Sequence, residues 1–292
     1  MSAPELAAGV IHDIGYRHHD GPRLGRRHAT LAVYLHTLRG MYGLGRPARA
    51  KVVPLLLLGI TVAPAAVSGA LAAATPLPAI PYTSYAYVVQ VAIVVFLAAQ
   101  AAQTVTGDIR FRVLSLYFSR PLERAAYVWA KLAALASGML VLLGAPLLVI
   151  YAAVLLAHTH SASDAAHETG RLLTGLGGSA VHAVLLASLG MAVAAMTRVR
   201  AFAVVGIAGL YLVATSASIL SAVVRGGGDL ALVLRMVSPF SLLDGFQVWA
   251  LRAAPVVPPG PGHLGWAYGL TTAALVSACA AFLHWRYRRI ES

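Results

Sequence analysis

Six apolar runs dominate the chain, and each is long enough to cross a bilayer as a helix. A hydrocarbon core about 30 Å thick needs roughly 20 apolar residues in a helix. The runs cover residues 52–74, 85–106, 128–157, 172–196, 202–224 and 266–285. This pattern predicts an all-α membrane protein with six transmembrane helices, in which residues 52–292 form the transmembrane domain.

The segment before the first run has a different pattern. Leu31, Tyr34, Leu35, Leu38 and Tyr42 recur at i, i+3, i+4, i+7 and i+11, which is typical of an amphipathic helix. We therefore expect residues 1–51 to form a cytoplasmic tail and an N-terminal amphipathic helix on the membrane surface. The alternative is a helix that lies free in the cytoplasm. The apolar pattern does not extend to residues 1–27, and their role is not indicated by it.

A seventh, weaker apolar segment lies between the last two runs. It contains Arg235 and Asp244, whose charges would each cost about 2–4 kcal/mol near mid-membrane. Pro239 would also break a helix at its centre, and Ser238 before it suits an N-cap. We expect a re-entrant helical hairpin around Pro239, Phe240 and Asp244, within an extracellular region covering residues 226–265.

Composition and charge give the location and orientation. The chain is 59% hydrophobic and 11% charged, whereas a soluble domain has roughly 25% charged residues. The net charge is +12, but its Arg and Lys residues border apolar runs, which favours an anionic leaflet over nucleic acid. With the N-terminus inside, 18 of the 22 basic residues are cytoplasmic. We expect a multi-pass protein of the cell membrane with both termini in the cytoplasm.

The longest charged interruption covers residues 107–131, between the second and third runs, and we call it the elbow. It contains Arg110, Arg112, Arg120, Arg124 and Lys131. Phe111, Leu114 and Phe118 share a helical face, so a short surface helix is expected over 108–118. The charge count places this segment in the cytoplasm. Arg198 and Arg200 lie in a second, shorter cytoplasmic connection.

Several kinds of chemistry lack their usual residues. All ten carboxylates lie outside the six apolar runs, which disfavours a proton-coupled carrier and an aspartyl intramembrane protease. The sequence has no G-x-x-x-x-G-K-[ST] motif and no G-x-S-x-G elbow. We therefore expect no enzyme activity and no cofactor in this chain. Energy for work against a gradient would have to come from another chain.

A few polar residues fall inside the runs. Gln90, Gln100 and Gln103 lie in the second run, and His182 lies in the fourth. Uncharged amides in a span either bond across helices or line a polar path, and the sequence leaves both open. A lone histidine is more often a hydrogen-bonded structural group than part of a path.

An outer loop contains three histidines and two carboxylates. His158, His160 and His167 are weak candidates for a metal site, because imidazole suits zinc and copper. Their spacing matches no standard signature. A solvated loop is the simpler interpretation, and no metal is expected.

The elbow resembles the corresponding part of the permease subunits of ABC-2 type transporters. The features are Gly107-Asp108, then Ser119-Arg120-Pro121-Leu122 with Arg124 and Tyr127, then Lys131. The surface helix, the six runs and the sequence SPFSLLDGF before the last run extend the likeness over nearly the whole chain. The resemblance implies a type V exporter fold, with two permease copies or half-permeases.

The resemblance also implies a function and partners. Each permease would dock a separate cytoplasmic ABC ATPase that binds ATP and magnesium, and membrane lipid would surround it. The elbow would act as a coupling helix. Residues implied in coupling are Asp108, Arg110, Arg112, Ser119, Arg120, Glu123, Arg124, Arg198 and Arg200.

The cargo implied is hydrophobic or amphipathic, such as a drug, a lipid-linked compound or a glycan-like one. Two other classes stay open: a membrane-embedded enzyme acting on lipid, and a non-transporting membrane anchor or assembly protein.

Overall fold

The computed structural model describes residues 25–75, 77–110, 123–158, 161–223, 229–258 and 260–289. Within these ranges the chain is helical and contains no strand. The helices are α1 (Arg26–Met41), α2 (Arg49–Ala74), α3 (Tyr85–Val88), α4 (Gln90–Arg110), α6 (Arg124–His158), α7 (Ala162–Ala195), α8 (Arg200–Val223), α9 (Asp229–Arg235), α10 (Pro239–Leu251), the short 3-10 helix η1 (Gly262–Leu264) and α11 (Gly265–Arg289). The predicted all-α class is confirmed for this part of the chain.

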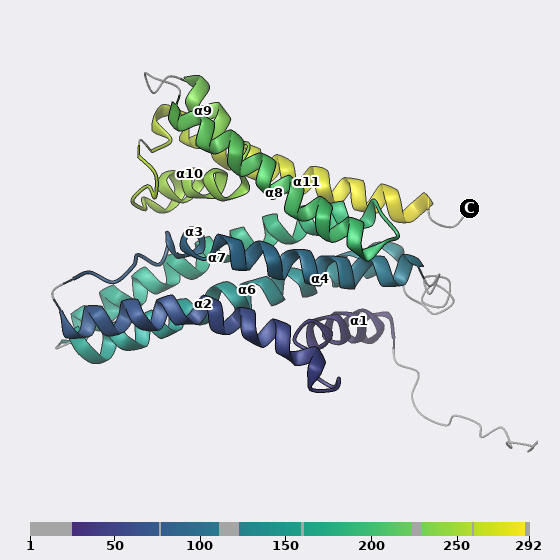
Figure 1. Cartoon of the computed structure of the whole chain (residues 1–292), viewed down its shortest axis with the longest axis horizontal. Coiled ribbons are helices and arrows are strands. Elements are labelled where there is room, and N and C mark those ends of the chain that lie inside the picture. Colours follow the sequence, from purple (N-terminus) through teal and green to yellow (C-terminus); the bar gives the residue numbers. More distant parts are fainter. Residues whose placement is uncertain are drawn as a thin grey trace, which may run out of the picture.

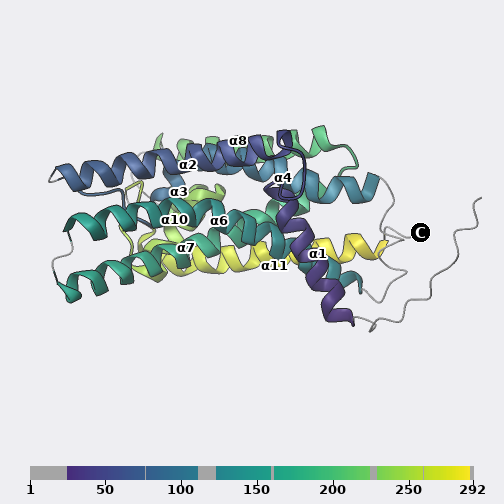
Figure 2. The same cartoon turned by 90° about the horizontal axis from the view of Figure 1, so that it is seen from below.

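The long helices lie side by side as one elongated bundle (Figures 1 and 2). Among the described residues, five helices are long and apolar enough to cross a membrane: α2, α6, α7, α8 and α11. The bent pair α9 and α10 passes the same test only when taken together, and α4 contributes a shorter apolar segment, Gln90–Thr106. Several long apolar helices fit the predicted membrane location.

Two predicted boundaries differ from the structure. The run over 85–106 is divided at Val89 into α3 and α4, although Ile93 N still donates to Val89 O at 3.1 Å across the break. The predicted span over 172–196 starts ten residues too late, because α7 begins at Ala162. At 34 residues α7 is about 51 Å long, so it extends beyond a hydrocarbon core of about 30 Å.

The surface helix α1 crosses the long helices at a steep angle near one end of the bundle (Figure 2). Tyr34, Leu38 and Tyr42 pack against the core, as the predicted stripe requires. Leu31 and Leu35, predicted in the same stripe, are 52% and 37% exposed. The predicted stripe therefore only partly faces the bundle: Tyr34, Leu38 and Tyr42 meet the core, whereas Leu31 and Leu35 lie at its edge and stay exposed.

Helix α6 is central to the packing, because it contacts α1, α2 and α7 extensively. Gly69 of α2 permits one close approach, since a Cβ there would lie 2.6 Å from Ala153 Cβ of α6. Gly138 of α6 permits another, where a Cβ would lie 2.8 Å from the Met41 methyl group of α1. Small residues at such crossings are what membrane helix packing requires, because they let backbones approach.

The segment between α8 and α11 folds as two short helices. Helices α9 and α10 meet at a bend of 115°, and Ser238 and Pro239 occupy the N-cap and first-turn positions of α10 as predicted. Phe240, Leu242 and Leu243 are buried against the bundle. The broken helical pair is thus present, packed on α7, α8 and α11.

Candidate functional site

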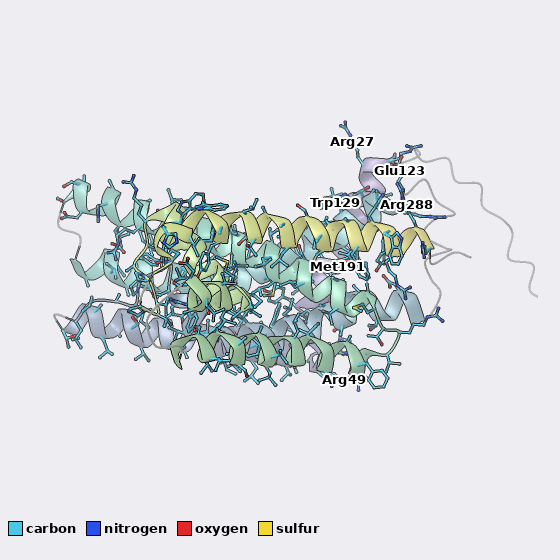
Figure 3. All side chains as sticks on the ribbon, turned by 90° about the horizontal axis from the view of Figure 1, so that it is seen from above. Arg27, Arg49, Glu123, Trp129, Met191 and Arg288 are labelled. Atoms are coloured by element: carbon cyan, nitrogen blue, oxygen red, sulfur yellow. The ribbon has the colours of Figure 1, made fainter. Side chains whose placement is uncertain are left out.

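The two ends of the elbow lie at one end of the bundle, together with α1, the α7–α8 connection and the end of α11 (Figures 1 and 2). Figure 3 shows Arg27, Glu123 and Arg288 gathered there. Described basic residues on these elements are Arg26, Arg27, Arg39, Arg46, Arg124, Lys131, Arg198, Arg200, Arg286, Arg288 and Arg289. The segments predicted to be cytoplasmic therefore share one face, which we call the basic end.

Asp108, at the end of α4, is fixed by two residues of α6. Lys131 Nζ lies 2.5 Å from Asp108 Oδ2, and the Tyr127 hydroxyl donates to the same carboxylate oxygen. Lys131 also donates to the Thr104 carbonyl at 2.8 Å. The side chains of Lys131 and Asp108 are only 9% and 20% exposed. A neutralising partner together with further hydrogen bonds is what a shielded ion pair needs to persist.

A second set of contacts joins α1 to the start of α6. Arg26 Nη1 lies 2.5 Å from Glu123 Oε1 in an exposed ion pair. Further along, the Tyr42 hydroxyl donates to Gly138 O at 2.7 Å, and Tyr34 bonds Ser137 Oγ at 3.0 Å. These contacts therefore hold α1 against the first half of α6 and the residue before it.

Besides Asp108 and Glu123, the predicted coupling residues divide into three groups. Arg112, Ser119 and Arg120 lie outside the described residues. Arg110 ends α4, and Arg124 begins α6, where its guanidinium donates to Arg288 O of α11 at 3.4 Å. Arg198 and Arg200 are exposed at the α7–α8 connection.

A cavity of about 270 Å³ opens beneath α1, against α4 and the start of α6. Two of the predicted path residues, Gln100 and Gln103, line it together with Thr104, Asp108 and Lys131. Gln100 is 3% exposed, and its Oε1 has no hydrogen-bond partner among the described residues. The cavity thus combines an apolar wall from α1 with polar groups from α4 and α6.

The other two predicted path residues lie elsewhere. Gln90 begins α4, about 15 Å along the helix from Gln100. His182 is buried where α7 meets α10, with Nδ1 3.0 Å from Gln247 Nε2 and 3.2 Å from Gly178 O. Its ring also faces Phe240, at 6.1 Å between centroids. His182 therefore occupies the structural, hydrogen-bonded environment that was the simpler expectation.

Two charged residues of the helical hairpin form an ion pair and are hydrogen-bonded to the backbone. Arg235 and Asp244 are both 8% exposed, with Nη2 and Oδ2 3.8 Å apart. Arg235 donates to Val257 O at 2.6 Å, and Val256 N donates to Asp244 Oδ1 at 3.1 Å. These bonds tie both short helices to the connection that follows α10.

One of the two carboxylates in the predicted outer loop is buried within a helix instead. Glu168, 6% exposed in α7, accepts a hydrogen bond from Tyr82 and lies 3.0 Å from Arg171 Nη1. Burial first, and then the neighbouring carboxylate, raises the pKa of Tyr82 well above its usual range. The phenol therefore stays protonated and keeps donating. The sequence Ser161-Ala162-Ser163-Asp164 is typical of a helix start, and it indicates that Glu168 lies within a helix.

Most of the predicted weak metal candidates lie outside what the structure describes. His160 lies outside the described residues, the side chain of His158 is likewise not described, and His167 is exposed on α7. No group of three His, Cys, Asp or Glu residues in the described ranges is arranged to hold an ion.

The sequence matches no protein-family model, and no curated protein is significantly similar to it. Assignment of a function therefore rests on the chemistry and geometry of the residues themselves.

Proposed function

We propose that this chain is the transmembrane subunit of an ATP-driven exporter that moves a hydrophobic or amphipathic compound across the cell membrane. In this proposal α2, α3 with α4, α6, α7, α8 and α11 are the six spans, and α9 with α10 is a re-entrant hairpin. A separate cytoplasmic ATPase supplies the energy, and the permease works as a homodimer or beside a second permease.

The observation that carries the proposal is the anchoring of the elbow. Its flanking helices are joined by the Asp108–Lys131 ion pair, and α1 is attached at Glu123. A basic segment held at both ends can pass a push from a docked partner to α4 and α6, because neither anchor yields independently. A free loop would absorb the same displacement.

Co-purification from gentle detergent tests the partner directly. We expect a soluble ATPase with a Walker A sequence to co-elute in stoichiometric amount. Arg112→Glu, Arg120→Glu and Arg124→Glu should each weaken its binding and reduce its stimulated ATPase activity. Arg252→Glu is a matched control, because Arg252 is exposed on the connection after α10. Unchanged ATPase stimulation in all three elbow variants would refute the coupling role.

The same preparation separates the alternatives. Lipid turnover by the purified chain alone would favour a membrane-embedded enzyme. Stable expression with no ATPase partner and no transport in proteoliposomes would favour an anchor or assembly protein.

A further inference from the structure

Two hollows meet along α1 at the basic end. The inner one is the cavity of about 270 Å³ against α4 and α6, and the outer one is a groove of about 670 Å³ along α1 and the turn after it. Ala32, His36, Gly40 and Arg46 line both hollows. Ligand sites typically have volumes of about 300–1,000 Å³, so the pair has the size of a binding site.

The inner cavity favours an anion with a hydrogen-bonding group. The charges of Lys131 and Asp108 neutralise each other at 2.5 Å, so the charge left in the lining is that of Arg46. The Arg46 guanidinium lies against α1, since a Cβ on Gly40 would be 3.3 Å from Nη2. Deeper in, the Gln100 amide has an oxygen with no partner in the described part of the chain, which a ligand hydroxyl can satisfy after rotation of the amide.

The outer groove favours an acyl chain. Leu31, Leu35 and Leu44 line it and are 52%, 37% and 57% exposed. Arg39 lies beside them, and no carboxylate is among the lining residues. Exposed leucines next to cations are the arrangement by which surface helices hold anionic lipids.

We propose that α1 and α4 form a binding site for a phosphate-bearing amphiphile drawn from the adjoining leaflet. Its phosphate pairs with Arg46, a headgroup hydroxyl bonds Gln100, and its chain follows Leu31, Leu35 and Leu44. The binding step stands on these residues alone. The further step, that such an amphiphile is the cargo, rests on the proposed exporter function.

Lipid retention measured by native mass spectrometry tests the site. The full chain is reconstituted in nanodiscs of phosphatidylcholine with one fifth phosphatidylglycerol, then released, and the bound lipids are identified. We expect phosphatidylglycerol to be retained selectively. Arg46→Gln should weaken retention about tenfold, equivalent to about 1.4 kcal/mol, because it removes a hydrogen bond between a guanidinium and the charged phosphate. Arg49→Gln removes the same charge three residues away, outside both linings, and should change nothing.

Two further variants keep the test decisive if Arg46→Gln folds poorly. Gln100→Leu should lower retention of phosphatidylglycerol, whose glycerol carries hydroxyls, more than that of phosphatidic acid. Ala32→Trp places a bulky side chain where the two hollows meet without changing the charge, and it should abolish lipid retention. Gel filtration and thermal unfolding of each variant verify its fold.

Three results would overturn the proposal. Equal retention of phosphatidylcholine would show that no anion is recognised. Equal losses in Arg46→Gln and Arg49→Gln would show only diffuse surface attraction. Complete displacement of the lipid by millimolar inorganic phosphate would show a phosphate site without a lipid-chain component. If lipid is not retained but an ATPase co-purifies and is stimulated, only the binding site is refuted. If lipid is retained but no ATPase co-purifies, only the exporter function is refuted.

Discussion

Lys131 Nζ lies 2.5 Å from Asp108 Oδ2 and so joins α6 to the last turns of α4, on either side of the elbow. Because both side chains are largely shielded, removing one charge leaves the other without its partner. Such a change typically costs about 3–5 kcal/mol.

Lys131→Met should therefore lower the apparent melting temperature in detergent clearly, by an amount equivalent to about 3 kcal/mol. The double variant Lys131→Met with Asp108→Asn should recover much of this loss, because no unpaired charge stays behind. Circular dichroism during heating measures both. Additive losses in the double variant would contradict the pairing.

The His182–Gln247 contact predicts a coupled pair between α7 and the helical hairpin. Gln247→Leu should cost about 1–3 kcal/mol, because the buried ring nitrogen loses the amide and keeps only the Gly178 carbonyl within hydrogen-bond distance. His182→Leu should cost a similar amount. Their combination should cost less than the sum, and thermal unfolding of all four proteins supplies the double-mutant cycle. Exact additivity would show that the two residues act independently.

Gly69 and Gly59 of α2 form a matched pair for testing the packing on α6. Gly69→Ala places a methyl 2.6 Å from Ala153 Cβ, whereas nothing lies within 4 Å of a Cβ at Gly59. The first change should destabilise by about 1–3 kcal/mol. The second should be neutral or stabilise by up to about 1 kcal/mol, since alanine favours helix. Adding Ala153→Gly to Gly69→Ala should restore stability if the contact is the cause.

The raised pKa of Tyr82 predicts a difference at alkaline pH. The pKa of Tyr82 is higher in the folded chain than its value of about 10 in the unfolded chain. The protonated phenol therefore contributes its full stabilisation below about pH 10, and this contribution is lost as the pH rises through the folded-state pKa. Tyr82→Phe should thus be less stable than the natural chain at neutral pH. The gap should narrow as pH rises above about 10. Melting temperatures measured side by side from neutral to alkaline pH check this, and a constant gap would exclude the Tyr82 titration.

The sequence predicted the apolar helices well because hydrophobic run length determines them. Helices α2, α6, α8 and α11 begin and end within a few residues of the predicted runs. Helix α7 was underestimated because its first turns are polar, although Ser161 caps it by accepting from Asp164 N at 3.2 Å. Of the α1 stripe, Tyr34, Leu38 and Tyr42 meet the core and Leu31 and Leu35 do not, because the angle at which α1 crosses the bundle decides which part of the stripe is covered.

The candidate site was predictable only in part. Asp108 and Lys131 were each singled out by their place in the elbow, but their pairing depends on how α4 and α6 align. The His182–Gln247 contact joins residues 65 positions apart, and no local pattern encodes that proximity. The cavity under α1 likewise arises from the angle of one helix across others.

Helix α6 has 35 residues in one continuous run, about 52 Å from end to end. Such a rod works as a lever: a tilt of about 5° at its basic end would carry the far end through roughly 4–5 Å. Since α1 and the elbow both attach in its first half, a small rotation there would move the opposite end of the bundle without any helix having to unwind.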